Sequence, residues 1–171
     1  MPRVARKNPY AAFNFVMDIV RMPAGMTSFP GGDVSRGEGD GGFMEASGLD
    51  SETSPIEYRE GNFQATATGN FVHKQAGLER YPNVVMRRGM TAHIALWSWR
   101  KLVMENGDRE QITGEINVTL QGENHTPVFR WTLKNCWPCK LSGPSLNAKS
   151  NEIAIETVEF CVERIVIEET F

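Results

Sequence analysis

The sequence has few of the side chains from which active sites are built. Its 171 residues include only three cysteines and three histidines, and the histidines are scattered. It contains no Gly-x-Ser-x-Gly, no His-Glu-x-x-His and no glycine-rich turn that leads into a helix, which are the common signatures of nucleophilic, metal-dependent and phosphate-binding sites. We therefore expect no catalytic residues, no metal, no cofactor and no enzymatic activity.

An excess of one charge and long apolar runs are also missing. The net charge is −3, whereas a general nucleic-acid binder carries a clear basic excess. The apolar stretch at residues 13–20 is too short to span a membrane and contains Asp18. No apolar segment follows the basic N-terminus, as it would in a signal peptide. We expect no specific nucleic-acid binding, no membrane anchor, and folding in a cytoplasm.

Cys136 and Cys139 stand in the stretch NCWPCK, with a spacing that also occurs in thiol-redox and zinc sites. A redox pair needs a helix after its first cysteine, and Gly143-Pro144 prevents one of useful length. A structural zinc needs four ligands, and the remaining ones would have to come from Cys161, His73, His93 and His125. We interpret the cysteines as small hydrophobic side chains and Pro138 as the end of a strand.

Most of the sequence alternates apolar with polar residues, which is typical of half-buried strands. The clearest case is a hairpin in which residues 122–125 form the turn. Residues 22–42 are rich in Gly and Pro and predict a long loop, while residues 63–81 fit no pattern well. Strands are predicted at 13–20, 43–49, 56–62, 84–89, 109–121, 126–135 and 151–169.

One helix is predicted, at about residues 91–106, with Thr91 as its cap and Asn106-Gly107 as its end. Its core stripe consists of Ala92, Ala95, Leu96, Trp99, Leu102 and Val103. The opposite side should be polar, yet it carries Ile94, Trp97 and Met104 beside His93 and Lys101. Either loops of the same chain cover this side, or it is a subunit interface, since exposed apolar surface with Trp marks contact sites.

We predict that two groups of charged residues lie on the solvated surface. The Arg87-Arg88 pair is short, and we expect it on the solvated surface. Glu156, Glu159 and Glu163 in the last strand have the residue type of paired catalytic carboxylates, but acidic residues are mostly solvated. We place Glu159 and Glu163 on one face of that strand because residues two apart share a face.

The sequence contains the stretches NPYAAFNFVMDI, GGFMEASGL with EYREGN, RRG before LWSW, and PVFRWTLKNCWPCKLSGPSLNAKSNEIAIETVEF. Together they resemble the inner tail tube protein family of contractile phage tails and phage-tail-like contractile injection systems. The resemblance runs from about residue 8 to about residue 163, and its most specific part is the ordered set of residues between Arg130-Trp131 and Ile155-Glu156.

The resemblance implies a single domain over residues 1–171, a β-sandwich or small β-barrel of antiparallel strands with one flanking helix. It implies hexameric rings that stack into a tube inside a sheath, with a hairpin or loop at about 43–62 that reaches the adjacent ring. The expected partners are other copies of the chain, sheath protein, baseplate or tube-initiator and cap proteins, and a protein cargo in the lumen. The particle would be assembled in a bacterial cytoplasm.

This expectation identifies two sets of residues. The subunit-interface candidates are Ile94, Trp97, Met104, Glu57, Tyr58, Arg59 and Glu60. The lumen-facing candidates are Thr157, Glu159 and Glu163, for which the outer, sheath-facing surface is the competing placement.

Two departures from the family pattern leave alternatives open. The loop at 22–42 is longer than expected, and residues 63–73 look inserted. Both features would suit a specialised first-ring or baseplate-adjacent tube protein as well as the main tube subunit. From other classes, a β-sandwich module that binds a ligand through loop 22–42 and a thiol enzyme that uses Cys136 and Cys139 remain as alternatives.

Overall fold

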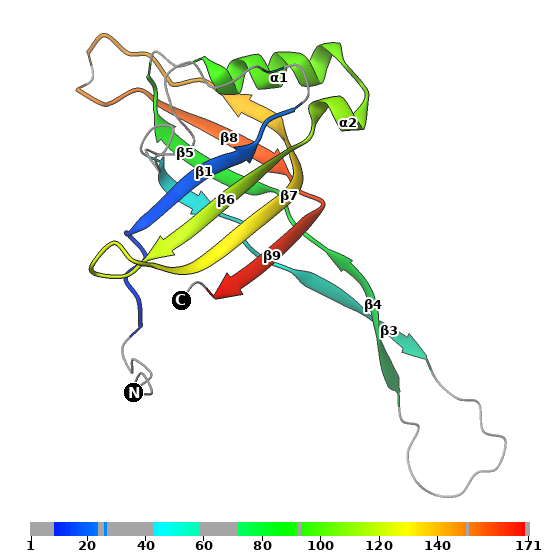
Figure 1. Cartoon of the computed structure of the whole chain (residues 1–171). Coiled ribbons are helices and arrows are strands. Elements are labelled where there is room, and N and C mark those ends of the chain that lie inside the picture. The colour runs from blue at the N-terminus through cyan, green and yellow to red at the C-terminus, as the bar shows by residue number, and fades with distance from the viewer. Residues whose placement is uncertain are drawn as a thin grey trace, which may run out of the picture.

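The protein is built almost entirely from antiparallel strands, as Figure 1 shows. The structure is a computed structural model, and it describes residues 9–23, 26, 43–58, 72–91, 94–149 and 151–169. Its elements are β1 (Phe15–Arg21), β2 (Phe43–Ser47), β3 (Glu52–Tyr58), β4 (His73–Arg80), β5 (Val84–Gly89), α1 (Ala95–Glu105), α2 (Arg109–Ile112), β6 (Gly114–Gln121), β7 (Pro127–Ser142), β8 (Ile155–Cys161) and β9 (Arg164–Glu169). The predicted mainly β fold with a flanking helix is confirmed.

Strand β7 holds the two halves of the fold together. Its first half pairs with β6 on one side and β9 on the other, and its second half pairs with β8. We call β1, β6, the first half of β7 and β9 the front sheet, and the second half of β7 with β8, β5 and β2 the back sheet. The change of partner occurs at Asn135, whose φ of 50° bends the strand.

Pro138 does not end the strand, so that prediction is wrong. Pro138 is buried, stands opposite Phe160 in the ladder, and pairing continues to Ser142. The register shifts between Pro138 and Lys140, and proline is tolerated in a strand at such a bulge or at a sheet edge. The stretch NCWPCK is therefore the bend at which β7 passes from one sheet to the other.

The predicted single strand at 151–169 is two strands. A bend at Val162 and Glu163 separates β8 from β9, and each strand pairs with a different half of β7. The bend also changes which side chains face inward. Ile165, two residues after the exposed Glu163, is buried in the core.

The core lies between the two sheets and beneath α1. Its buried apolar residues come from β1, β5, β6, β7, β8 and β9, and the predicted stripe of α1 contributes Ala95, Leu96 and Trp99. The Trp99 ring lies 5.6 Å from that of Phe160, centroid to centroid. Gly114 is required where α1 meets the front sheet, since a Cβ there would lie 2.6 Å from the Arg21 carbonyl oxygen and 2.8 Å from the Trp99 ring.

The helical region differs from its predicted bounds. Helix α1 begins at Ala95 and no side chain caps it, so Thr91 is not its cap. The residues predicted to form its first turn, Ala92 and His93, lie outside the described residues. A second helix, α2, occupies 109–112 where a strand was predicted, because the Asp108 side chain accepts a hydrogen bond from the Glu110 backbone N–H at its start.

The strands between residues 43 and 80 pair with partners that their sequence pattern did not predict. Strand β2 joins β5 in the back sheet, whereas β3 pairs with β4 in a separate two-stranded ribbon. The second strand of the extended hairpin thus lies at 73–80, within a segment that fitted no pattern. Residues 59–71 and nearly all of the predicted loop 22–42 lie outside the described residues.

Candidate assembly surfaces

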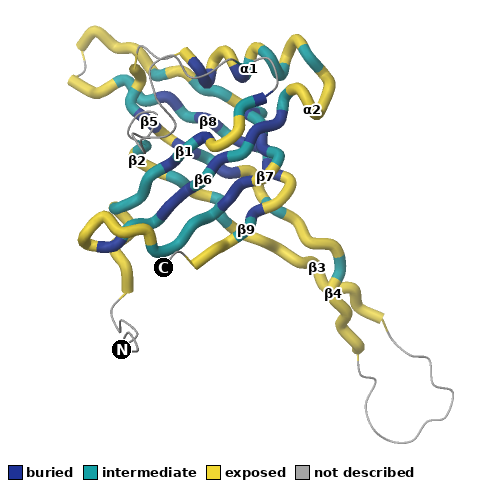
Figure 2. The backbone as a smooth tube through the Cα atoms, in the orientation of Figure 1, coloured by how far each residue is buried: buried dark blue, intermediate teal, exposed yellow. Residues whose placement is uncertain are grey.

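The β3–β4 ribbon projects from the sandwich and has almost no buried surface of its own (Figure 2). By strand register, one face carries Ile56, Tyr58 and Leu78, which are 54%, 46% and 83% exposed. The other face is polar and holds the ion pair of Glu57 with Lys74. An isolated two-stranded ribbon is marginally stable in water, which makes the apolar face a candidate contact surface.

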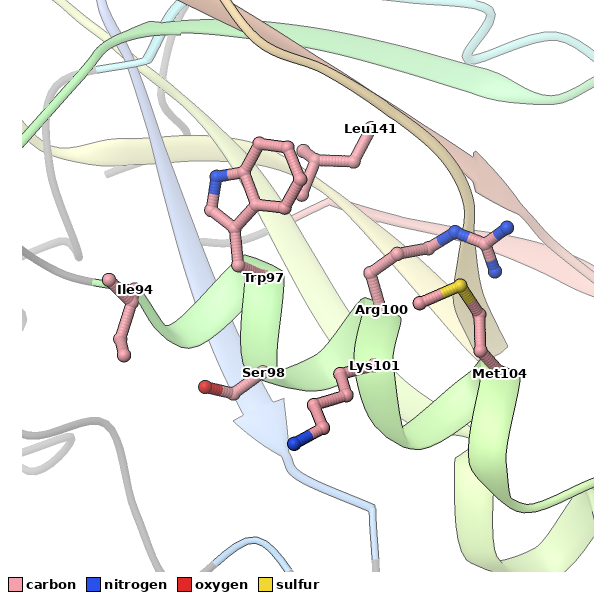
Figure 3. Close-up of a pocket in the computed structure, with 7 residues that line it drawn as sticks. All are labelled: Ile94, Trp97, Ser98, Arg100, Lys101, Met104 and Leu141. Atoms are coloured by element: carbon pink, nitrogen blue, oxygen red, sulfur yellow. The ribbon is translucent and has the colours of Figure 1, made fainter.

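Helix α1 presents the second unpartnered apolar surface. Its outward side forms, with β7, a pocket of about 510 Å³ that we call the α1 groove. Figure 3 shows Trp97 beside Leu141 and Arg100 beside Met104. Ile94 and Met104 are 63% and 67% exposed. The full lining is Ile94, Trp97, Ser98, Arg100, Lys101, Met104 and Leu141.

Trp97 is anchored from below by a buried ion pair. Its indole N–H donates to Glu156 Oε2 at 3.2 Å, and the other carboxylate oxygen of Glu156 accepts from Arg88 Nε. Arg88 and Glu156 are 1% and 2% exposed, and the Phe43 ring lies 5.8 Å from the guanidinium carbon. The prediction of solvated surface is therefore wrong for both charged residues.

The signal for this pair was present in the sequence. On β5, Arg88 lies an even number of residues from the core residues Val84 and Met86, so it shares their face of the strand. On β8, Glu156 shares a face with Val158 and Phe160 in the same way. Two inward-facing opposite charges at the same end of neighbouring strands indicate a buried pair. Arg87, which faces the other way, is exposed and pairs with Glu45 at 3.1 Å.

The front sheet has an apolar inner face and a polar outer face. Along its four strands, the residues that point away from the core are mostly charged or hydroxylated. Thr132 Oγ1 donates to Asn117 Oδ1 at 2.9 Å, and Arg130 has a buried Nε without a hydrogen-bond partner. Burial raises the pKa of Asp18, and the charge of Arg130 opposes that rise. The polar residues of this outward face are Asp18, Asn117, Thr119, Arg130, Thr132, Lys134, Arg164 and Glu168, and Val16 and Val166 lie among them.

The front sheet also has two free edges. Within the described ranges, β1 pairs only with β6 and β9 pairs only with β7. Because each of the three pairings in this sheet is antiparallel, β1 and β9 run in opposite directions. The two edges can therefore pair with each other, antiparallel, between two copies of the chain.

The three predicted lumen residues do not share one strand face. Thr157 and Glu159 lie half-buried on the outer face of β8, where Glu159 accepts from Asn83 Nδ2 at 2.8 Å. Glu163 lies in the bend after β8, accepts from Asn135 Nδ2 at 2.9 Å and pairs with Arg109. These hydrogen bonds, with the nearby charge of Arg109, lower the pKa of Glu163.

The cysteines lie in surroundings that disfavour thiolates. Burial raises the pKa of Cys136 to about 12, and it also raises the pKa values of Cys139 and Cys161. A nucleophilic thiol needs a lowered pKa. In the described part of the chain, no three His, Cys, Asp or Glu side chains form a metal-binding group.

Of the predicted interface residues at 57–60, the structure describes only Glu57 and Tyr58. Tyr58 stacks on His73 with ring centroids 5.3 Å apart, while Arg59 and Glu60 lie outside the described residues.

None of the helices that the structure describes is long and apolar enough to cross a membrane.

Comparison with known proteins gives one family and several solved structures of the same fold. The family described as T4-like virus tail tube protein gp19 matches residues 11–166. The chain is similar to a protein in the anti-feeding prophage (AFP) tube terminating cap, with 24% identity, a TM-score of 0.73, and coverage of 98% of this chain and 95% of that one. No curated protein matches the sequence significantly.

Two further structures share the fold. For a protein of the PVC sheath-tube complex, an extracellular contractile injection system in its extended state, the identity is 20%, the TM-score 0.70, and the coverage 96% of this chain and 94% of that one. For Hcp1 from Salmonella typhimurium, the identity is 10%, the TM-score 0.51, and the coverage 91% and 85%.

Proposed function

The chain belongs to the T4-like virus tail tube protein gp19 family, which matches residues 11–166, and we propose that it builds the inner tube of a phage tail or contractile injection system. Membership of this family makes it a structural tube subunit, as its resemblance to tail tube proteins predicted. In our proposal, hexameric rings stack into a hollow tube, and a contracting sheath drives this tube through a target envelope.

We propose that β1 of one copy pairs with β9 of the next to close each ring. The opposite directions and free edges of these strands support this arrangement. A contact between two different edges is heterologous, and it closes into a ring of fixed subunit number when its rotation divides a full turn evenly. The product is a shared barrel without unpaired edges, which removes the tendency of edge strands to aggregate.

We propose that the outer face of the front sheet lines the lumen. An antiparallel sheet with one apolar face and one polar face is suited to a core on one side and water on the other. Asp18, Asn117 and Arg130 would then face the channel. This orientation favours the sheath-facing alternative for Thr157 and Glu159, which lie on the back sheet.

The partners that we propose follow from proteins of the same fold in structures of an AFP tube terminating cap, a PVC sheath-tube complex and an AFP baseplate. We extend to this chain contacts with sheath protein, with baseplate or tube-initiator proteins and with a cap, and a protein cargo in the lumen. We propose further that the subunit is not an enzyme and that it assembles in the bacterial cytoplasm.

Negative-stain electron microscopy of the purified chain, combined with light scattering, tests this proposal. We expect hexameric rings and hollow tubes. Single rings that never stack would favour the specialised first-ring protein, and uniform monomers of 19.1 kDa would favour a ligand-binding module and contradict the tube function.

A further inference from the structure

We propose that the apolar face of the β3–β4 ribbon of one copy binds in the α1 groove of another copy in the adjacent ring, with Glu52 beside Arg100. This inference rests on the proposed tube function and adds the receptor surface for the ribbon. Within the described residues, the ribbon face and the groove each gather several exposed large apolar side chains.

The positions of the two surfaces suit contact between copies. In Figure 1, α1 lies across one end of the sandwich and the β3–β4 ribbon extends away from the opposite end. The ribbon therefore cannot reach the groove of its own chain. A contact between surfaces at opposite ends is heterologous and repeats without limit along an axis, which is the geometry of stacked rings.

The lengths of the two surfaces agree. Helix α1 has 11 residues, which span about 16 Å at 1.5 Å per residue. The ribbon face from Glu52 to Tyr58 spans about 20 Å at about 3.3 Å per residue. Ile56, Tyr58 and Leu78 can thus lie along the groove between Ile94 and Met104.

Charge provides the register of this contact. Lys101 already pairs with Glu105 at 3.6 Å, whereas Arg100, half-buried in the groove, has no ion pair among the described residues. On the ribbon, Glu57 is paired with Lys74 on the polar face. Glu52 lies on the same face as Ile56 and is exposed. Arg80 stands opposite Glu52 in the ladder, but Glu52 has no ion pair among the described residues. It is the carboxylate that matches Arg100.

Charge reversal tests the pairing. We expect Arg100→Glu and Glu52→Arg, each alone, to form rings normally but to reduce the number of stacked tubes in micrographs at least tenfold. The double variant Arg100→Glu/Glu52→Arg should restore tubes, because the opposite charges again face each other. Tubes of normal length in both single variants would overturn the inference.

Cross-linking tests the contact itself in assembled protein. We would mix a Ser98→Cys variant with a Ser54→Cys variant and oxidise them with copper–phenanthroline, since Ser98 lines the groove and Ser54 lies on the apolar ribbon face. The matched control is Thr53→Cys, which lies one residue away on the opposite face. We expect a covalent heterodimer with Ser54→Cys and at least fivefold less with Thr53→Cys.

The outcomes separate this inference from the proposed function. If wild-type protein forms tubes but the two ribbon variants cross-link equally or not at all, the receptor assignment is wrong and the tube function stands. If wild-type protein forms neither rings nor tubes, the tube function is wrong and this inference falls with it.

Discussion

The back sheet and the β3–β4 ribbon are both antiparallel, but they differ in how much of their side-chain surface is buried or paired within the chain. In the back sheet, inward residues are buried and even the charges of Arg88 and Glu156 are paired within the chain. In the ribbon, Ile56, Tyr58 and Leu78 face outward with no cover. The two sheets with α1, which we call the body, bury most of their apolar side chains within the chain. The ribbon leaves its apolar face exposed, and in our proposal another copy covers it.

The largest effect on the body should come from breaking the buried ion pair. Glu156→Ala leaves the Arg88 charge buried and unpaired and removes the acceptor of the Trp97 N–H, so we expect a loss of about 3–5 kcal/mol in the free energy of unfolding. Urea denaturation measures this loss when Glu156→Ala is made in a variant of the protein that does not assemble. The control Arg87→Ala breaks an exposed pair and should cost less than about 1 kcal/mol. Equal losses would contradict the comparison.

A smaller loss is expected where α1 meets the front sheet. Gly114→Ala places a methyl group against the Trp99 ring and the Arg21 carbonyl, which should cost about 1–3 kcal/mol by overpacking. Gly107→Ala is the matched control, because a Cβ there meets nothing within 4 Å. Thermal unfolding of the two variants should differ clearly, and similar midpoints would show that the close approach is relieved elsewhere.

The groove and the ribbon should show the opposite behaviour. Ile94→Asp and Leu78→Ser change exposed side chains, so we expect the free energy of unfolding to change by less than about 0.5 kcal/mol while assembly is weakened. Size-exclusion chromatography with light scattering measures the assembly. Unchanged oligomers in both variants would remove the interface assignment.

Trp97 belongs to both regions, and its substitution should show both effects. Trp97→Ala removes groove surface and also one donor to buried Glu156, which adds a loss of about 1–3 kcal/mol in the free energy of unfolding. We expect assembly to be weakened at protein concentrations and temperatures where the monomer is still folded. Loss of folding without any loss of assembly in the folded fraction would contradict this.

The smallest effect concerns pH. The pKa of Glu163 is lowered from 4.5 in the folded chain, chiefly by Asn135 and also by Arg109, so the carboxylate stabilises the fold above about pH 4.5 and this stabilisation is lost as pH falls through the lower folded pKa. The midpoint of thermal unfolding should therefore fall more between pH 5 and pH 3 in wild type than in Glu163→Gln. Parallel curves for the two proteins would exclude this role.

Local patterns in the sequence predicted much of the body. The β6–β7 hairpin, strand β5 and the buried stripe of α1 follow from alternation and helical periodicity, because each is decided by which residues face the core. The same reasoning identified Ile94, Trp97 and Met104 as apolar residues on the outer side of α1, and the structure places them there, exposed.

Other features depend on contacts between residues far apart in the sequence. The β3–β4 pairing joins Glu52 to Arg80 across a long insertion, and no local pattern indicates it. The change of partner in β7 depends on the bend at Asn135 and on where β8 and β9 lie. The polar outer face of the front sheet depends on the registers of four strands, which no local pattern indicates.

A cryo-electron microscopy reconstruction of the assembled wild-type protein tests the central claim most directly, namely that the body is complete while its edges, groove and ribbon are completed by other copies. We predict β1 of one subunit beside β9 of the next, the face with Asp18 and Arg130 on the lumen, and each ribbon against α1 in the adjacent ring. Rings whose β1 and β9 edges stay unpaired, with the front sheet on the outside, would contradict the account.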